Sequence, residues 1–244
     1  MSALSLLLSH LLAAYAAVGE PVLGARMYRG LERAVARDGG ARVRFYRLSM
    51  VIEWSWVLAV GLILLSGGLP LSEVGLRWES PPAMVVGFVV AVGFGMLIPI
   101  AVPWLKSRRS GGAGAGDSSA VREMLEPVGA LLPNTRKERR LFAALAVTAG
   151  ICEEILFRGF LLFYLQEVFP GFGVVGAVAV SSMVFGLCHL YQGVRGILGT
   201  GAFGAGMAIL YVASGSLIVP IVLHALLDLR VLLLHRPTAG EDGA

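Results

Sequence analysis

The sequence carries little charge for its length. Only 15% of its 244 residues are charged and 57% are hydrophobic, whereas a typical soluble domain carries about 25% charged residues. The chain therefore lacks the polar surface that a water-soluble globule needs, which excludes a separate soluble catalytic domain. The composition predicts an integral membrane protein embedded in a lipid bilayer.

Cysteine is scarce, and two informative patterns are missing. Cys152 and Cys188 are the only cysteines, and both lie in apolar segments, so we interpret them as small buried hydrophobic side chains rather than a disulfide framework. No His-Glu-x-x-His sequence occurs, which excludes the helix of a conventional zinc protease. The absence of an internal repeat of fixed period argues against an inverted-repeat transporter.

Long apolar runs dominate what the sequence does contain. A transmembrane helix needs about 20 mostly apolar residues, and this criterion predicts an all-α, polytopic bundle of about seven spans. The first run resembles the core of a signal peptide but has no basic residue before Arg26, so we interpret it as a span. The predicted spans are 3–19, 49–69, 83–105, 141–166, 173–190, 196–213 and 217–234.

The basic residues predict the topology. Arg and Lys gather in segments 24–47 and 106–140, whereas Arg77 is the only basic residue in segments 70–82 and 167–172. Cytoplasmic loops carry an excess of Arg and Lys, so the N-terminus is predicted outside and the C-terminus in the cytoplasm. The net charge of +4 arises from these loops and is typical of contact with an anionic membrane surface. No nucleic-acid partner is expected.

A glycine-rich stretch predicts how the chain is divided. Residues 106–119 are interpreted as a flexible cytoplasmic linker because Gly, Ala and Ser dominate their second half. Before it, residues 1–105 form N-terminal transmembrane helices without an expected group of intramembrane ionisable residues. After it, residues 120–236 form the predicted catalytic core, and residues 237–244 a disordered tail.

Ionisable residues in three of the core spans are the candidate functional residues. A charge near the centre of a bilayer costs about 2.5–3.5 kcal/mol even on the mildest scale. Glu154 and Arg158 are four residues apart and can pair on one helical face, whereas Glu153 is rotated by about 100° and lacks a local partner. His189 lies on the next span, and His224 and Asp228 share a face of the last one. A purely structural network of ion pairs and hydrogen bonds is the alternative interpretation.

Together these residues resemble the motifs of a known family. Glu153-Glu154-x-x-x-Arg158, Phe185-x-x-x-His189 and His224-x-x-x-Asp228 occur in this order on successive apolar spans. The set is similar to the three motifs of the CAAX protease and bacteriocin-processing (Abi, CPBP) family of intramembrane proteases, related to the type II CAAX prenyl endopeptidases. The resemblance covers about residues 120–235.

The resemblance implies a membrane endopeptidase and assigns roles to the candidate residues. Glu153 and His189 would activate a water for attack on a peptide carbonyl, and His224 and Asp228 would stabilise the oxyanion or complete the polar site. Asp228 stands where many relatives have Asn; an ionised carboxylate cannot donate a hydrogen bond, so Asp228 could orient His224 instead. Glu154 and Arg158 would support the site. Zinc, if bound, would be held by Glu153, His189 and His224.

The expected substrate is a membrane-associated protein or peptide, and the relatives suggest a prenylated one. The Ala-, Gly- and Arg-rich composition with short loops favours a prokaryotic plasma membrane. Two alternatives remain open at this point: a proton- or ion-coupled transporter, which also needs buried carboxylates and histidines, and a non-catalytic immunity or scaffold protein that keeps the motifs. The predicted depths of the candidate residues in the membrane also disagree. Glu153 and His224 fall near the middle of their predicted spans, whereas His189 falls near the cytoplasmic end of its span. Either that helix extends beyond residue 190, or the cavity opens toward the cytoplasm.

Overall fold

The computed structural model describes residues 1–78, 89 and 125–235, and every regular element in these ranges is a helix. The predicted all-α class is therefore confirmed. The predicted span 83–105, apart from residue 89, the linker 106–119 and the tail 237–244 lie outside the described residues. Four helices are long and apolar enough to cross a membrane in the described part of the chain: Ala3–Ala34, Ala41–Gly67, Pro170–Cys188 and Leu190–Ser214.

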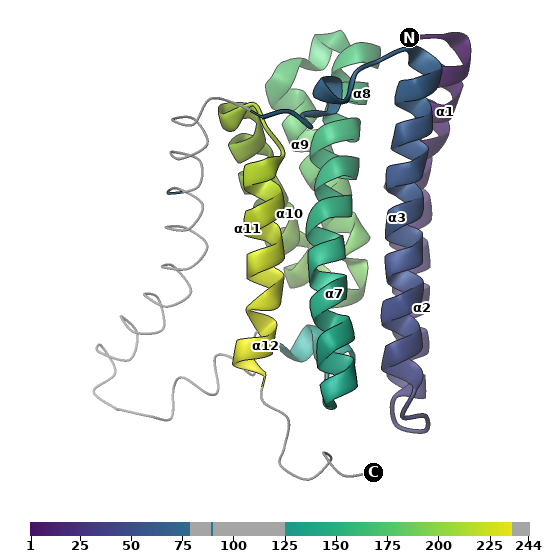
Figure 1. The fold of residues 1–244 in the computed structure, drawn as a ribbon, viewed down its shortest axis with the longest axis vertical. Coiled ribbons are helices and arrows are strands. Elements are labelled where there is room, and N and C mark those ends of the chain that lie inside the picture. The colour runs from purple at the N-terminus through teal and green to yellow at the C-terminus, as the bar shows by residue number, and fades with distance from the viewer. Residues whose placement is uncertain (79–88, 90–124, 236–244) are drawn as a thin grey trace.

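The N-terminal third forms a hairpin of two long helices. Elements α1 (Ala3–Ala14), η1 (Tyr15–Gly19) and α2 (Glu20–Ala34) run on as one helix, and α3 (Ala41–Gly67) returns beside it (Figure 1). The prediction of a loop over 24–47 is thus wrong in extent, since only residues 35–40 lie between the helices. Leu, Met, Ala, Glu and Arg are good helix formers, so the helix continues past the apolar stretch that the hydropathy criterion detects.

The remaining helices form a bundle around a central one. After the short η2 (Leu71–Val74) and η4 (Glu126–Leu131), elements α7 (Arg136–Glu153), η5 (Glu154–Leu161) and α8 (Leu162–Val168) form a continuous helix. It packs between α3 and α11 (Ile218–Leu229) (Figure 1). Behind it lie α9 (Gly173–Cys188) and α10 (Gly193–Ser214). The short η6 (Pro170–Phe172) leads from α8 into α9, η7 (Leu190–Gln192) joins α9 to α10, and α12 (Val231–Leu234) ends the described chain.

The predicted spans 141–166 and 217–234 differ from the four apolar helices. Both are helical, but charged residues interrupt the first, and the second consists of α11 and the four-residue α12. The number of seven spans is therefore not reproduced in the described residues. These two segments are also the ones that carry Glu153 and His224, and their polar residues make them less apolar than an ordinary span.

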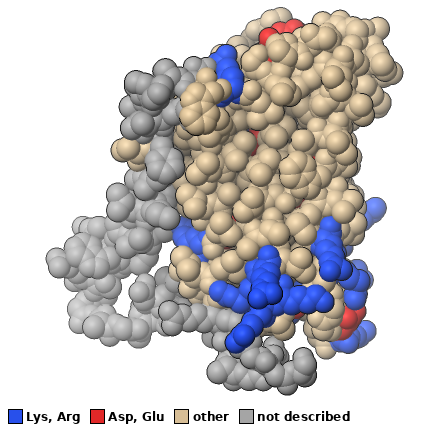
Figure 2. Space-filling model, in the orientation of Figure 1, with Lys and Arg blue, Asp and Glu red and all other residues tan. Residues whose placement is uncertain are grey.

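Lys and Arg gather at one end of the molecule. Helix α2 ends there and α3 and α7 begin there, and Figure 2 shows most blue side chains at this end and one small blue patch at the opposite end. We call it the basic end. It brings segment 24–47 together with residues 125–140, the described part of segment 106–140; the basic residues of both segments predict a cytoplasmic location.

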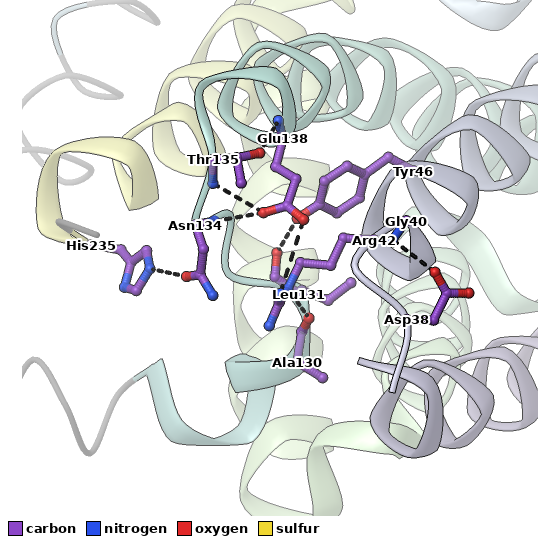
Figure 3. A network of polar contacts seen from close by, with 10 residues as sticks. All are labelled: Asp38, Gly40, Arg42, Tyr46, Ala130, Leu131, Asn134, Thr135, Glu138 and His235. Carbon is purple, nitrogen blue, oxygen red and sulfur yellow. Dashed lines mark hydrogen bonds and ion pairs between the residues drawn. The ribbon is translucent and has the colours of Figure 1, made fainter. Parts of the chain in front are cut away.

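A hydrogen-bonded clasp joins the elements at the basic end (Figure 3). Tyr46 Oη donates to Leu131 O over 2.6 Å, and Arg42 Nε donates to Ala130 O over 2.9 Å. Glu138 accepts from the backbone of Asn134 and Thr135, and Thr135 caps α7 in return. These contacts hold η4 against the start of α3 and fix where α7 begins.

We expect Tyr46→Phe to lower the free energy of unfolding by about 1 kcal/mol, because the fully buried phenol is the donor to Leu131 O. The measurement is reversible unfolding in mixed detergent micelles. Tyr164→Phe is the matched control, since Tyr164 is also buried but its hydroxyl makes no hydrogen bond to the residues that the structure describes. An equal loss in both variants would contradict a specific role of the clasp.

Candidate active site

His224 is held from one side by a buried carboxylate. Its Nδ1 lies 2.7 Å from Glu154 Oε1, and the same oxygen accepts from Arg158 Nη1 over 3.0 Å. The side chains of Glu154 and Arg158 are 0% and 1% exposed. Because an ionised Glu154 can only accept, Nδ1 of His224 must be the donor. Glu154, rather than Asp228, is therefore the residue that orients this ring, and the sequence spacing alone did not indicate it.

The segment that carries Glu154 and Arg158 is itself unusual. At Glu154 the α-helical turns give way to the π-helical turns of η5, a rare geometry that is frequent at functional sites. The Arg158 guanidinium lies over the Phe185 ring, 4.2 Å from its centroid, a cation–π contact. Phe157 packs edge-on against the same ring. Arg158 thus pairs with its own helix and also packs against α9.

The other nitrogen of His224 faces two carboxylates. Nε2 lies 3.8 Å from Glu153 Oε2 and 3.7 Å from Asp228 Oδ2, too far for direct hydrogen bonds. Close packing of α7 and α11 fixes this arrangement: a Cβ built on Gly150 would lie 2.7 Å from Ala225 N. Only a glycine allows the two backbones to approach so closely, directly beside His224.

His189 lies at the end of α9, where its helix stops. Its Nδ1 is 2.9 Å from Phe185 O, and a carbonyl can only accept, so Nδ1 carries the hydrogen and Nε2 of the neutral ring is free to accept. Helix α9 ends at Cys188. The helix that carries His189 therefore does not extend beyond residue 190, which was the first of the two explanations for the position of His189 near the end of its span. No hydrogen bond or ion pair joins His189 to Glu153 within the described part of the chain.

A single cavity of about 310 Å³ brings the candidate residues together. Glu153, His189, His224 and Asp228 all line it, whereas Glu154 and Arg158 lie behind its wall. Residues near the basic end line it as well, among them Phe45, Val128, Leu131 and Val231. The cavity therefore extends from the ionisable residues toward the basic end, the end that the positions of Lys and Arg predict to be cytoplasmic.

The cavity wall also contains two carboxylates that lie outside the three sequence motifs. Glu20 of α2 and Glu53 of α3 both line the cavity, so residues 1–105, for which the sequence predicts no group of intramembrane ionisable residues, also contribute carboxylates to the cavity wall. Glu53 lies within the predicted span 49–69, and the rule that pointed to Glu153 applies to it equally. Neither residue belongs to a recognisable motif, which is why the motif pattern passed over them.

The residues named as conditional zinc ligands do not form a ligand group. Glu153, His189 and His224 line one cavity, but no cluster of three or more His, Cys, Asp or Glu side chains among the described residues has an arrangement that could hold a metal ion. The donor set is chemically suitable for zinc, but its geometry in this structure does not fit. No step of the proposed reaction is therefore assigned to a metal.

Comparison with known proteins identifies the family of this region. Residues 136–230 match the family model described as type II CAAX prenyl endopeptidase Rce1-like. Over these residues the chain is similar to an Rce1-like CAAX protease domain. A search of curated proteins and a search of solved structures found no significant match.

The match confirms the resemblance that the three motifs indicated. It spans all six candidate residues, from Glu153 to Asp228, and excludes α2 and α3 with Glu20 and Glu53. The family is a protease family, and together with the apolar helices it shows an integral membrane protein. The Rce1-like domain thus supplies the motif residues, while the preceding hairpin supplies part of the cavity wall.

We expect Arg158→Ala to lower the free energy of unfolding by about 3–5 kcal/mol, because it leaves the buried Glu154 carboxylate without its cation. Unfolding in mixed micelles measures the loss. Arg26→Ala, on the exposed surface of α2, is the control and should change stability by less than about 0.5 kcal/mol. If the two variants were equally stable, the buried pair would not support the fold in the way inferred here.

Proposed function

We propose that the protein is an intramembrane endopeptidase that hydrolyses a peptide bond of a membrane-associated protein or peptide with a water activated by Glu153 and His189. The observation that carries this proposal is the convergence of Glu153, His189, His224 and Asp228, from three separate segments, on one cavity. The protease family of residues 136–230 supports it independently.

Glu153 and His189 are assigned to water activation. Glu153 is half-buried in the cavity wall and has no direct hydrogen-bond partner in the described chain, so its carboxylate is free to accept a proton. His189 Nε2 is free to accept a second hydrogen bond from the same water because Nδ1 is committed to Phe185 O. The water oxygen attacks the carbonyl carbon, its proton passes to Glu153, and Glu153 returns the proton to the leaving amine.

His224 is assigned to the oxyanion. Its Nε2 faces the cavity, and Glu154 fixes the ring through Nδ1. A protonated ring would be flanked by Glu154, Glu153 and Asp228, and its Nε2–H would donate to the developing oxyanion. Asp228 is then a partner of the charged ring rather than a donor to substrate, which accounts for an Asp where many relatives have Asn.

A prenylated protein is the substrate class that we favour, since the family description names CAAX prenyl endopeptidases. The wall toward the basic end is rich in apolar side chains, including Met27, Phe45, Ile52, Phe142 and Leu145. Such a surface suits an isoprenoid chain by burial of apolar area. The basic end would face the cytoplasm of a prokaryotic cell, where a lipidated C-terminus could enter.

Glu153→Gln and His189→Ala should each lower kcat by about 10²–10⁴-fold, the range for loss of a general base, while the protein remains folded. The measurement is cleavage of farnesylated peptides by purified protein in vesicles, together with a comparison of the membrane proteomes of cells that express wild type or Glu153→Gln. Glu167→Gln, on the exposed surface of α8, is the matched control and should keep wild-type kcat.

Near wild-type cleavage by Glu153→Gln would contradict the assigned base. A metal analysis distinguishes water activation by Glu153 and His189 alone from a zinc mechanism. About one tightly held zinc per chain, with activity lost on chelation and restored by zinc, would make Glu153, His189 and His224 metal ligands instead. Proteome differences that depend on Glu153 would identify the substrate at the same time.

The orientation is tested by cysteine labelling. Gly171 and Gly39 lie near opposite ends of the bundle, and a Cβ at either position meets no atom within 4 Å, so Gly171→Cys and Gly39→Cys should leave the fold intact. A membrane-impermeant maleimide added to intact cells should label Gly171→Cys and not Gly39→Cys. Cys152 and Cys188 are buried and give little background. External labelling of Gly39→Cys would reverse the proposed orientation.

A further inference from the structure

Glu53 is a buried carboxylate for which the described part of the chain provides no hydrogen-bond or ion-pair partner. Glu53 is 8% exposed and lines the cavity. Its Oε2 makes no hydrogen bond with the residues that the structure describes. The charged groups that act on the Glu53 carboxyl, Glu153, Asp228 and Glu20, are all acidic. A buried carboxyl group usually has a cation or several donors beside it, and no such group lies beside Glu53 in the described parts of the chain.

The cavity as a whole has the same imbalance. Its described wall contains four carboxylates, Glu20, Glu53, Glu153 and Asp228, and two imidazoles, but no Lys or Arg. Arg158, the nearest guanidinium in sequence, is committed to Glu154 behind the wall. Glu20 already accepts from Tyr15 Oη over 2.5 Å. Glu53 is therefore the carboxylate in this wall that most clearly lacks a positively charged hydrogen-bond donor.

The helix faces direct Glu53 and Glu153 into the same space. On α3 the wall residues are Phe45, Ser49, Ile52, Glu53 and Trp56; on α7 they are Phe142, Leu145, Ala146, Ala149 and Glu153. Both sets recur every three or four residues, which defines one face of each helix. Because α3 packs along α7, these two faces border the cavity together.

The clasp gives the relative depth of the two carboxylates. Arg42 of α3 and Glu138 of α7 lie 4.0 Å apart, which aligns the two helices at the basic end (Figure 3). Counted from this contact, Glu53 is nearer to the basic end than Glu153 by about one helical turn, or about 6 Å. An extended peptide advances about 3.3–3.6 Å per residue, so this offset corresponds to about two residues of substrate.

We infer that Glu53 is a specificity-determining residue that binds an ammonium or guanidinium group of the substrate, a Lys or Arg side chain within about two residues of the cleaved bond. The inference rests on the proposed endopeptidase function and names a feature of its substrate. A charged donor bound to Glu53 supplies the missing partner for Oε2 and offsets the excess of carboxylates in the wall. Ser49, one turn nearer the basic end, lies on the path of such a side chain.

The test uses a defined library of N-acetylated peptides, each made with and without a farnesylated cysteine, and the full-length protein in vesicles. Mass spectrometry identifies the cleaved bonds. We expect Lys or Arg within two residues of the cleaved bond in the preferred peptides. N-acetylation ensures that the cation is a side chain and not the terminal amine.

The best Lys-containing peptide and its Lys→Gln analogue then measure the contribution of Glu53. Wild type should favour the Lys peptide by at least about tenfold in kcat/KM, the effect of one charge-assisted hydrogen bond. Glu53→Gln should reduce this ratio to about one, and Glu53→Asp, which keeps the charge, should retain part of it. Glu32→Gln, on the exposed surface of α2, should leave the ratio unchanged.

The outcomes separate this inference from the proposed function. Equal cleavage of both peptides by wild type, or an equal loss for both peptides in Glu53→Gln, would overturn the role of Glu53 and leave the endopeptidase assignment standing. Absence of cleavage of every library peptide by the folded wild-type protein would overturn the proposed function, and the inference with it.

Discussion

The rest of the site depends on the hydrogen bonds that the Glu154 carboxylate accepts from Arg158 and His224. The carboxylate is fully buried, and a single oxygen joins Arg158 on its own helix to His224 on α11. A buried charge is tolerated only when it is paired and hydrogen-bonded, so these three side chains must form and keep one arrangement. That arrangement turns the second nitrogen of His224 toward Glu153 and Asp228 and places Arg158 against Phe185.

The cavity in front of this network belongs to both halves of the chain. The Rce1-like region supplies the motif residues, and the N-terminal hairpin supplies Glu20, Glu53 and much of the apolar wall. Its chemistry changes along its length, with ionisable groups at one side and apolar side chains toward the basic end. In a protease that works within a membrane, such a division would let a lipid-bound substrate dock by apolar contact while its peptide bond meets the polar residues.

Much of the fold and of the candidate site could be predicted from the sequence alone, but two features could not. Apolar runs predicted an all-helical membrane protein, and three short motifs predicted the family and the pairing partner of Arg158. The loop over 24–47 was predicted too long because hydropathy identifies the apolar part of a helix that can lie in the bilayer and not the ends of the helix itself. Arg-rich segments can continue a helix beyond the apolar part. Glu20 and Glu53 were passed over because isolated carboxylates carry no spacing pattern, although their apolar surroundings were visible in the sequence.

The sequence by itself determined the helical class, the chemical inventory of the site and the order of its motifs, because these follow from composition and from spacing along one helix. The tertiary structure alone decided which groups meet. His224 and Asp228 are four residues apart, yet the ring is held by Glu154, 70 residues away, because the glycine contact at Gly150 brings α7 against α11. Contacts between helices depend on how their faces pack, and a period of 3.6 residues carries no information about the partner helix.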